Sequence, residues 1–272
     1  MGFSEPGIGF ANHITEPLIM IPIMILIIYG GLGFIVLEQI YRLKSISRLN
    51  VYAKLVLVTT GLLILVGMLA YLFLEWDNPA TFGPLTVPQK ILAALFQSVN
   101  TRTAGFAGIN QDGLGEVSKT LTCVLMLIGG AASSTSGGIK VVTLATLFLY
   151  TWARLQGKRT INVFHRKIST AQLLDAVTIT GLMAGLSVIG GVFISVDSDI
   201  NIGPAVFSSI SAIATCGLSI QETAALRIPS QVLLMLFMFF GRVGVLSISL
   251  SFMIADPAEE RIQRAETRLI IG

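Results

Sequence analysis

Charged residues are scarce in this sequence: they make up 12% of the 272 residues, whereas hydrophobic residues make up 53% and the mean hydropathy is +0.80. A soluble globular domain carries about 25% charged residues, so the composition excludes that class and indicates an integral membrane protein. Cysteine and histidine are also rare, with two residues of each. Their spacing offers neither a disulfide framework nor a metal site. We interpret all four as structural, namely Cys123, Cys216, His13 and His165.

The basic residues are unevenly distributed, although the net charge is only +3. They form three clusters that adjoin apolar runs, and acidic residues occupy the segments between them. By the positive-inside rule the clusters are cytoplasmic, which predicts a multi-pass plasma-membrane protein with a cytoplasmic C-terminus. Nucleic-acid binding is disfavoured because each cluster adjoins an apolar run. The clusters are Arg42, Lys44, Arg48 and Lys54; Arg154, Lys158, Arg159, Arg166 and Lys167; and Arg261, Arg264 and Arg268.

Long apolar runs predict the membrane spans. No basic region precedes the first run, so we expect no secretory signal peptide. Two further apolar stretches, at 91–99 and 204–213, are too short to span, because a spanning helix needs about 20 residues. The predicted spans are residues 18–37, 55–74, 121–150, 173–196 and 231–254.

A polar turn follows each of the two short stretches. A helix that stops inside a membrane leaves bare backbone carbonyls, which are tolerated only within protein or beside a watery path. Carbonyls gathered in this way can replace the water shell of a cation, and glycine suits such a turn because it adopts positive φ. The pattern therefore predicts two pore helices, each followed by part of a selectivity filter. The turns are Thr103, Ala104, Gly105 and Phe106, and Thr215, Cys216, Gly217 and Leu218.

A unit of span, short helix, turn and span occurs twice, and an offset of 112 residues relates the copies. The start of the chain, Gly2-Phe3, resembles the turns as well, so we expect the chain to begin inside an earlier unit. Repeats that leave a surface unpaired must assemble together, so several units are expected to surround one axis. The expected boundaries are residues 1–50, 51–165 and 166–272.

The third predicted span is interrupted at residues 129–138 by small and hydroxylated residues. Each glycine costs a helix about 1 kcal/mol relative to alanine, so a broken helix is expected here, and a break at membrane depth belongs beside a pathway. A packing notch of small residues is the alternative. The residues considered for this loop and its surroundings are Gly129, Gly130, Ser133, Ser134, Thr135, Ser136, Gly137, Gly138 and Lys140.

Three basic residues lie near these features. Arg242 interrupts an otherwise apolar span at a cost of at least about 2.5 kcal/mol, so it must face protein or a wet cavity. By the offset it matches Gly130, and we hypothesise that it hydrogen-bonds the loop and holds it across a pore as a gate. Lys140 is interpreted as a snorkelling end residue. Arg102 is interpreted as an anchor that pairs with acids of the outer loops, in preference to direct tuning of an ion.

Four segments closely resemble the Trk/Ktr/HKT superfamily of potassium transporters, and within it the KtrB-like membrane subunits. They are F-Q-S-V-N-T-R-T-A-G-F (96–106), G-G-A-A-S-S-T-S-G-G-I-K (129–140), A-T-C-G-L-S (214–219) and G-R-V-G (241–244). The resemblance implies an all-α integral membrane fold, in which four membrane-pore-membrane repeats with re-entrant pore helices surround a pseudo-fourfold axis. It also implies filter glycines at Gly2, Gly105 and Gly217, a gating loop at 129–138, and Arg242 as the partner of that loop.

The resemblance carries further expectations about activity and assembly. It implies potassium uptake, with sodium as a coupling ion in many members, a homodimer, and a cytoplasmic ring of nucleotide-binding RCK subunits. The chain would contain the inner half of the second repeat and all of the third and fourth, so it would need the missing N-terminal repeats to close a pore. Cys216 stands where the family commonly has valine or another small residue, and little effect on selectivity is expected because the backbone coordinates.

Three alternatives to a potassium transporter remain: a secondary transporter, an intramembrane protease and an inactive truncated product. A secondary transporter with re-entrant hairpins and a midplane substrate site needs polar side chains within its spans, and the spans offer only Arg242. An intramembrane protease needs a nucleophile beside a base or a pair of carboxylates. Ser133, Ser134 and Ser136 have no such neighbours in the sequence. We therefore expect no enzyme activity and no covalent cofactor.

Overall fold

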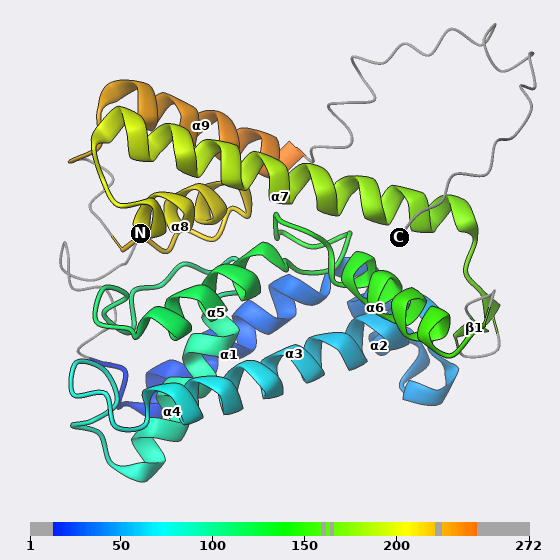
Figure 1. Ribbon diagram of the computed structural model, residues 1–272. Helices are drawn as coiled ribbons and strands as arrows, with labels where there is room; N and C mark the ends of the chain where they lie inside the picture. Colours follow the sequence, from blue (N-terminus) through cyan, green and yellow to red (C-terminus); the bar gives the residue numbers. More distant parts are fainter. Residues whose placement is uncertain (1–12, 159–161, 164–165, 221–224, 244–272) are drawn as a thin grey trace, which may run out of the picture.

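The computed structural model describes residues 13–158, 162–163, 166–220 and 225–243, and these residues are almost entirely helical (Figure 1). The only sheet among them is a short antiparallel pair, in which Asn162 faces Lys167. The helices are α1 (Pro17–Leu32), α2 (Phe34–Leu43), the 3-10 helix η2 (Ile46–Arg48), α3 (Val51–Glu75), α4 (Val87–Asn100), α5 (Glu116–Leu127), α6 (Val141–Leu155), α7 (Thr170–Ser198), α8 (Ile202–Ile213) and α9 (Ile228–Val243); the strands are β1 (Asn162–Val163) and β2 (Arg166–Lys167).

The helices form two similar groups. In the first, the short helix α4 folds back against the long helix α3; in the second, α8 folds back against α7 and also packs on α9. Figure 1 shows α7 and α9 running side by side along one edge of the molecule, with α3 along the opposite edge. The two groups meet where α5 packs on α8 and α6 packs on α7.

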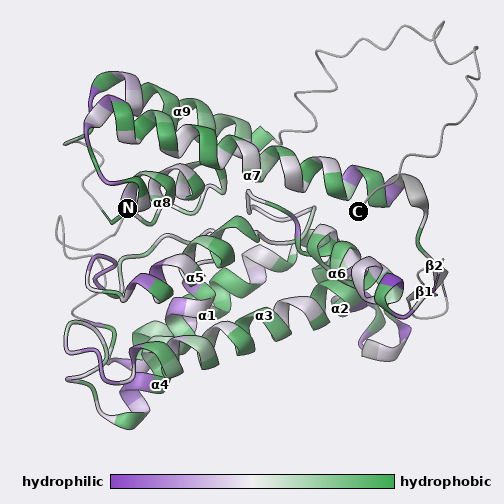
Figure 2. Ribbon diagram, viewed as in Figure 1, coloured by the Kyte–Doolittle hydropathy of each residue, from purple (hydrophilic) through white to green (hydrophobic). Residues whose placement is uncertain are grey.

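Within the part of the chain that the structure describes, two helices, α3 and α7, are each long and apolar enough to cross a membrane. Both expose large apolar side chains, and Figure 2 colours much of each ribbon green, the colour of hydrophobic residues. An apolar outer surface is what a lipid-facing helix requires, since lipid replaces water as the solvent. The exposed side chains include Leu62, Leu69 and Phe73 on α3 and Val188, Ile189 and Val196 on α7.

The predicted continuous span at residues 18–37 is wrong, because the helix breaks at Gly33 and the two parts, α1 and α2, meet at 99°. Gly33 has φ +78°, and a Cβ there would lie 2.8 Å from the backbone carbon of Ser133. The Phe34 N–H donates to the Ser133 carbonyl at 3.3 Å instead of continuing the helical pattern. A contact with a distant loop therefore decides where this helix ends.

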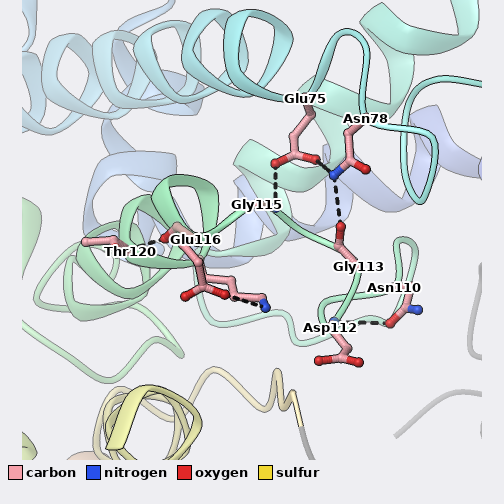
Figure 3. A network of polar contacts seen from close by, with 9 residues as sticks. Glu75, Asn78, Asn110, Asp112, Gly113, Gly115, Glu116 and Thr120 are labelled. Carbon is pink, nitrogen blue, oxygen red and sulfur yellow. Dashed lines mark hydrogen bonds and ion pairs between the residues drawn. The ribbon is translucent and has the colours of Figure 1, made fainter.

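A buried carboxylate fastens the end of α3 to the start of α5 (Figure 3). Glu75 has no exposed surface. One of its oxygens accepts from the Gly115 N–H at 3.0 Å, and the other accepts from Asn78 Nδ2 at 2.6 Å and Thr81 Oγ1 at 2.7 Å. Asn78 Nδ2 also donates to the Gly113 carbonyl at 2.9 Å. These hydrogen bonds of Glu75 and Asn78, here called the Glu75 clamp, therefore hold both ends of the segment that contains α4 and its turn.

We expect Glu75→Gln to lower the free energy of unfolding by about 1–3 kcal/mol, because the new amide places a donor against groups that themselves donate. Thermal unfolding of the purified protein in detergent measures this change. Glu116→Gln is the matched control, since the Glu116 side chain is 87% exposed and pairs with Lys119, and an exposed pair contributes about 0–1 kcal/mol. Equal shifts in the two variants would contradict the assigned role of the Glu75 clamp.

Candidate ion pathway: two turns and a broken helix

In each group, the chain enters the short helix and returns from the turn after it at the same end of the group. The Lys90 ammonium near the start of α4 donates to the Trp76 carbonyl at 2.6 Å, and Glu75 binds Gly115 before α5. The chain from α4 to α5 therefore goes inward and returns. In the second group, Ser230 of α9 donates to the Asp197 carboxylate of α7 at 2.6 Å, which gives α8 and its turn the same arrangement.

Protein, not lipid, surrounds the inner ends of the two short helices. Every residue of α4 from Phe96 to Asn100 is buried, and so is every residue of α8 from Phe207 to Ile213. The start of α4 has a capping box in which Thr86 N donates to Gln89 Oε1 at 2.9 Å, so the helix begins where the sequence provides a cap. Both helices thus end in a protein-lined interior.

The two turns share an unusual backbone. Thr103 and Thr215 have φ of +59° and +54°, and the glycines two residues later have φ of +70° and +94°. A β-branched residue rarely adopts positive φ, so finding it at equivalent positions of both turns indicates a common requirement. Strain of this kind gathers at functional sites.

The structure brings the two turns together. A Cβ built on Gly105 would overlap the Cys216 carbonyl oxygen and lie 3.1 Å from the Gly217 Cα atom. Among the described residues, no donor is bonded to the carbonyls of Thr103, Ala104 and Gly105, or to those of residues 215–218. Unpaired carbonyls at this depth are the kind of oxygen that can bind a cation.

The predicted break in the third span is confirmed, since α5 ends at Leu127 and α6 begins at Val141. Two hydrogen bonds close the neck of the intervening loop: Gly129 N to the Ile139 carbonyl and Ile139 N to the Leu127 carbonyl, both at 2.8 Å. Ala131 N donates to the Gly31 carbonyl at 2.9 Å, so the loop also lies against the break after α1.

The loop contacts both turns directly. Thr103 Oγ1 donates to Ser136 Oγ at 2.8 Å, and the Gly137 N–H donates to Thr215 Oγ1 at 3.0 Å. The two threonine hydroxyls therefore bind neighbouring residues of one loop. The alternative of a simple packing notch does not account for these two polar contacts with equivalent threonines.

Two basic side chains donate hydrogen bonds to the same part of the loop. Arg242 donates through Nη1 to the Thr135 carbonyl, so the hydrogen bond expected from the sequence is present. Lys140 donates through Nζ to the Ser136 carbonyl. The interpretation of Lys140 as a snorkelling residue is therefore wrong, because its amine turns back to the loop. Whether these contacts gate a pathway stays a prediction.

Some residues that the sequence singled out are not described, and Arg102 lacks its expected partner among those that are. Gly2 and Phe3 lie outside the described residues, as do residues 244–254 of the last predicted span. Arg102 is 8% exposed, and no carboxylate among the described residues lies within ion-pair distance of it, so the expected pairing with outer acids is not found. The described residues also contain no cluster of three metal-ligating side chains.

Sequence reasoning missed two residues that fix the turns. The Asn100 amide bonds both the N–H and the carbonyl of Phe106. Ser211 accepts from Cys216 N through its carbonyl at 2.8 Å and from Gly217 N through its hydroxyl at 3.1 Å. Both are short polar residues near the end of an apolar helix, which is where such side chains bond backbone groups. A short polar residue at the end of an apolar helix was therefore the feature of the sequence that could have indicated these two residues.

A helical membrane protein in which buried short helices end in neighbouring turns with unpaired carbonyls has the features of a cation transport protein. A family model described as a cation transport protein, TrkH, matches residues 1–264. The chain therefore belongs to the TrkH family.

Individual relatives agree with this assignment. The chain is 34% identical to Ktr system potassium uptake protein B of Vibrio alginolyticus, over 99% of this chain and 59% of that protein. It is 30% identical to the potassium/sodium uptake protein NtpJ of Enterococcus hirae, over 100% of this chain and 61% of that protein. These names are those of uptake proteins, which agrees with the expectation that the chain is not an enzyme.

The fold also matches a solved structure. The crystal structure of the potassium transporter TrkH from Vibrio parahaemolyticus aligns with a TM-score of 0.72 and 19% identity, over 93% of this chain and 55% of that one. The predicted helical membrane fold is thereby confirmed. The chain spans about three fifths of the length of the two uptake proteins named above.

Proposed function

We propose that this chain forms part of a pathway for potassium uptake across the plasma membrane. The observation that carries the proposal is the pair of neighbouring turns with unpaired carbonyls at the ends of two buried helices. Hard cations bind oxygen ligands, and a ring of carbonyls offers them without charged side chains. The carbonyl ends of α4 and α8 add partial negative charge on the same side.

Four membrane-pore-membrane units around a pseudo-fourfold axis would complete the filter. Residues 51–165 and 166–272 supply two of them, and 1–50 supply the inner half of another. The remaining repeats then close the pore. Gly2 and Phe3 would contribute the corresponding turn of the earlier unit.

The loop at 129–138 acts as the gate in this proposal. Its residues 135–137 bind Thr103, Thr215 and Arg242, so displacing this part of the loop would break contacts with both turns. Sodium is the coupling ion, a proposal supported by the similarity to NtpJ, a potassium/sodium uptake protein. The complete protein is a homodimer regulated by a cytoplasmic nucleotide-binding RCK ring, with its C-terminus in the cytoplasm.

Rubidium uptake tests the proposal, with the complete membrane protein reconstituted into vesicles. We expect uptake that excess potassium suppresses and that an equal concentration of sodium suppresses far less. Empty vesicles provide the background. Uptake no greater than this background, with the protein inserted and folded, would refute the proposed function; uptake driven only by an organic substrate would favour a secondary transporter.

A further inference from the structure

Asn100, in the last turn of α4, has no exposed surface. Its side chain forms two hydrogen bonds with a single residue: Nδ2 donates to the Phe106 carbonyl at 2.6 Å, and the Phe106 N–H donates to Oδ1 at 2.8 Å. The same carbonyl accepts from the Gly108 N–H at 3.0 Å. A carbonyl oxygen has two lone pairs, so protein donors occupy both acceptor positions of this one.

The second turn is held in another way. Ser211 accepts from the N–H groups of Cys216 and Gly217. Among the described residues, no donor is bonded to the Leu218 carbonyl, which occupies the position equivalent to the Phe106 carbonyl. The two turns thus have matching backbones but differ in the availability of one oxygen.

We infer that Asn100 is a positioning residue that sets which oxygens the filter offers. It holds the Phe106 carbonyl away from the ion, so that the first turn contributes the carbonyls of Thr103, Ala104 and Gly105, while the second turn also contributes that of Leu218. A cation at the Phe106 and Leu218 level therefore keeps more of its water shell than a cation bound at the deeper levels. This inference rests on the proposed function and goes beyond it by naming an asymmetry between equivalent turns.

The alternative role for Asn100 is purely structural, as a support for the end of α4. The two roles differ in their consequences. A structural support would change the amount of folded protein and leave the ion preference intact. A positioning residue changes the ion preference itself, because the Phe106 carbonyl becomes free to approach the ion when the Asn100 donor is lost.

The experiment uses the complete protein in vesicles and measures the preference for rubidium over sodium. Asn100→Asp keeps the shape and the acceptor for Phe106 N, but its carboxylate does not donate to the Phe106 carbonyl. We expect the preference to change by about tenfold, the scale of one buried hydrogen bond. Asn110→Asp is the matched control: Asn110 is exposed, and its Oδ1 accepts from Asp112 N at 3.1 Å, a bond that aspartate retains.

An unchanged ion preference in Asn100→Asp would overturn the inference, as would an equal change in both variants. A second measurement does not depend on the variant folding: anomalous diffraction from the unaltered protein with rubidium bound. No rubidium within coordination distance of the Phe106 oxygen is expected, and a rubidium ion coordinated by that oxygen would overturn the inference. If the unaltered protein carries no rubidium at all, the proposed function fails instead, so the two failures are distinguishable.

Discussion

Replacing Gly105 by alanine is expected to abolish rubidium uptake. The φ of Gly105 is +70°, which costs an alanine residue about 1–3 kcal/mol. More importantly, the added Cβ would overlap the Cys216 carbonyl oxygen of the neighbouring turn. Because backbone atoms meet on both sides, neither turn can give way without moving the carbonyls that are proposed to bind the ion. Uptake into vesicles, with the amount of inserted protein measured in parallel, checks this result.

Two glycines serve as comparisons for Gly105→Ala. At Gly217 the added Cβ meets only the Gly105 Cα atom, at 3.7 Å, so alanine there suffers the backbone strain without the overlap. Gly181 lies within α7 and has nothing within 4 Å, so alanine there is expected to be tolerated or to stabilise by about 0.5–1 kcal/mol. Selective uptake by Gly105→Ala at the rate of the unaltered protein would contradict the proximity of the two turns.

Replacing Arg242 by alanine is expected to raise the rate of rubidium uptake. The guanidinium holds the loop through the Thr135 carbonyl, and a typical hydrogen bond contributes about 0.5–1.5 kcal/mol. Losing it would shift the balance between held and released loop by roughly 2- to 10-fold. Initial rates of uptake, measured with and without the nucleotide of the proposed regulatory ring, report both the flux and its control.

Arg242→Lys should fall between the unaltered protein and Arg242→Ala, because lysine keeps the charge but lacks the planar fork of arginine. Arg154→Ala is the matched control: Arg154 is exposed at the end of α6, and its Nε donates to Tyr150 Oη at 3.0 Å, away from the loop. If Arg242→Ala leaves the rate and its regulation unaltered, Arg242 is not part of a gate.

Local patterns in the sequence predicted the elements around the pathway. The short apolar stretches became α4 and α8, and the run of small residues became the loop between α5 and α6. These predictions succeed because helix length and glycine content act locally. The continuous span at 18–37 failed for the opposite reason: the break at Gly33 depends on Ser133, one hundred residues away.

The side chains beside the two turns also divide into those whose partners the sequence predicted and those whose partners it did not. The repeat placed Arg242 at the level of the loop, and a charge within an apolar span had to find a polar partner. No such argument fixed the partners of Lys140, Arg102 or Asn100. The partners of Lys140 and Asn100 are backbone groups that the neighbouring segments leave available, and these are known only once the chain has folded.

The sequence by itself determined a membrane protein with two related units, each with a short helix and a glycine turn, because composition and repeat length act along the chain. Tertiary structure alone decided that the two turns lie against each other, that one loop touches both threonines, and that the oxygens of Phe106 and Leu218 differ in availability. Those features arise from contacts between residues far apart in the chain, and such contacts exist only once the helices have packed.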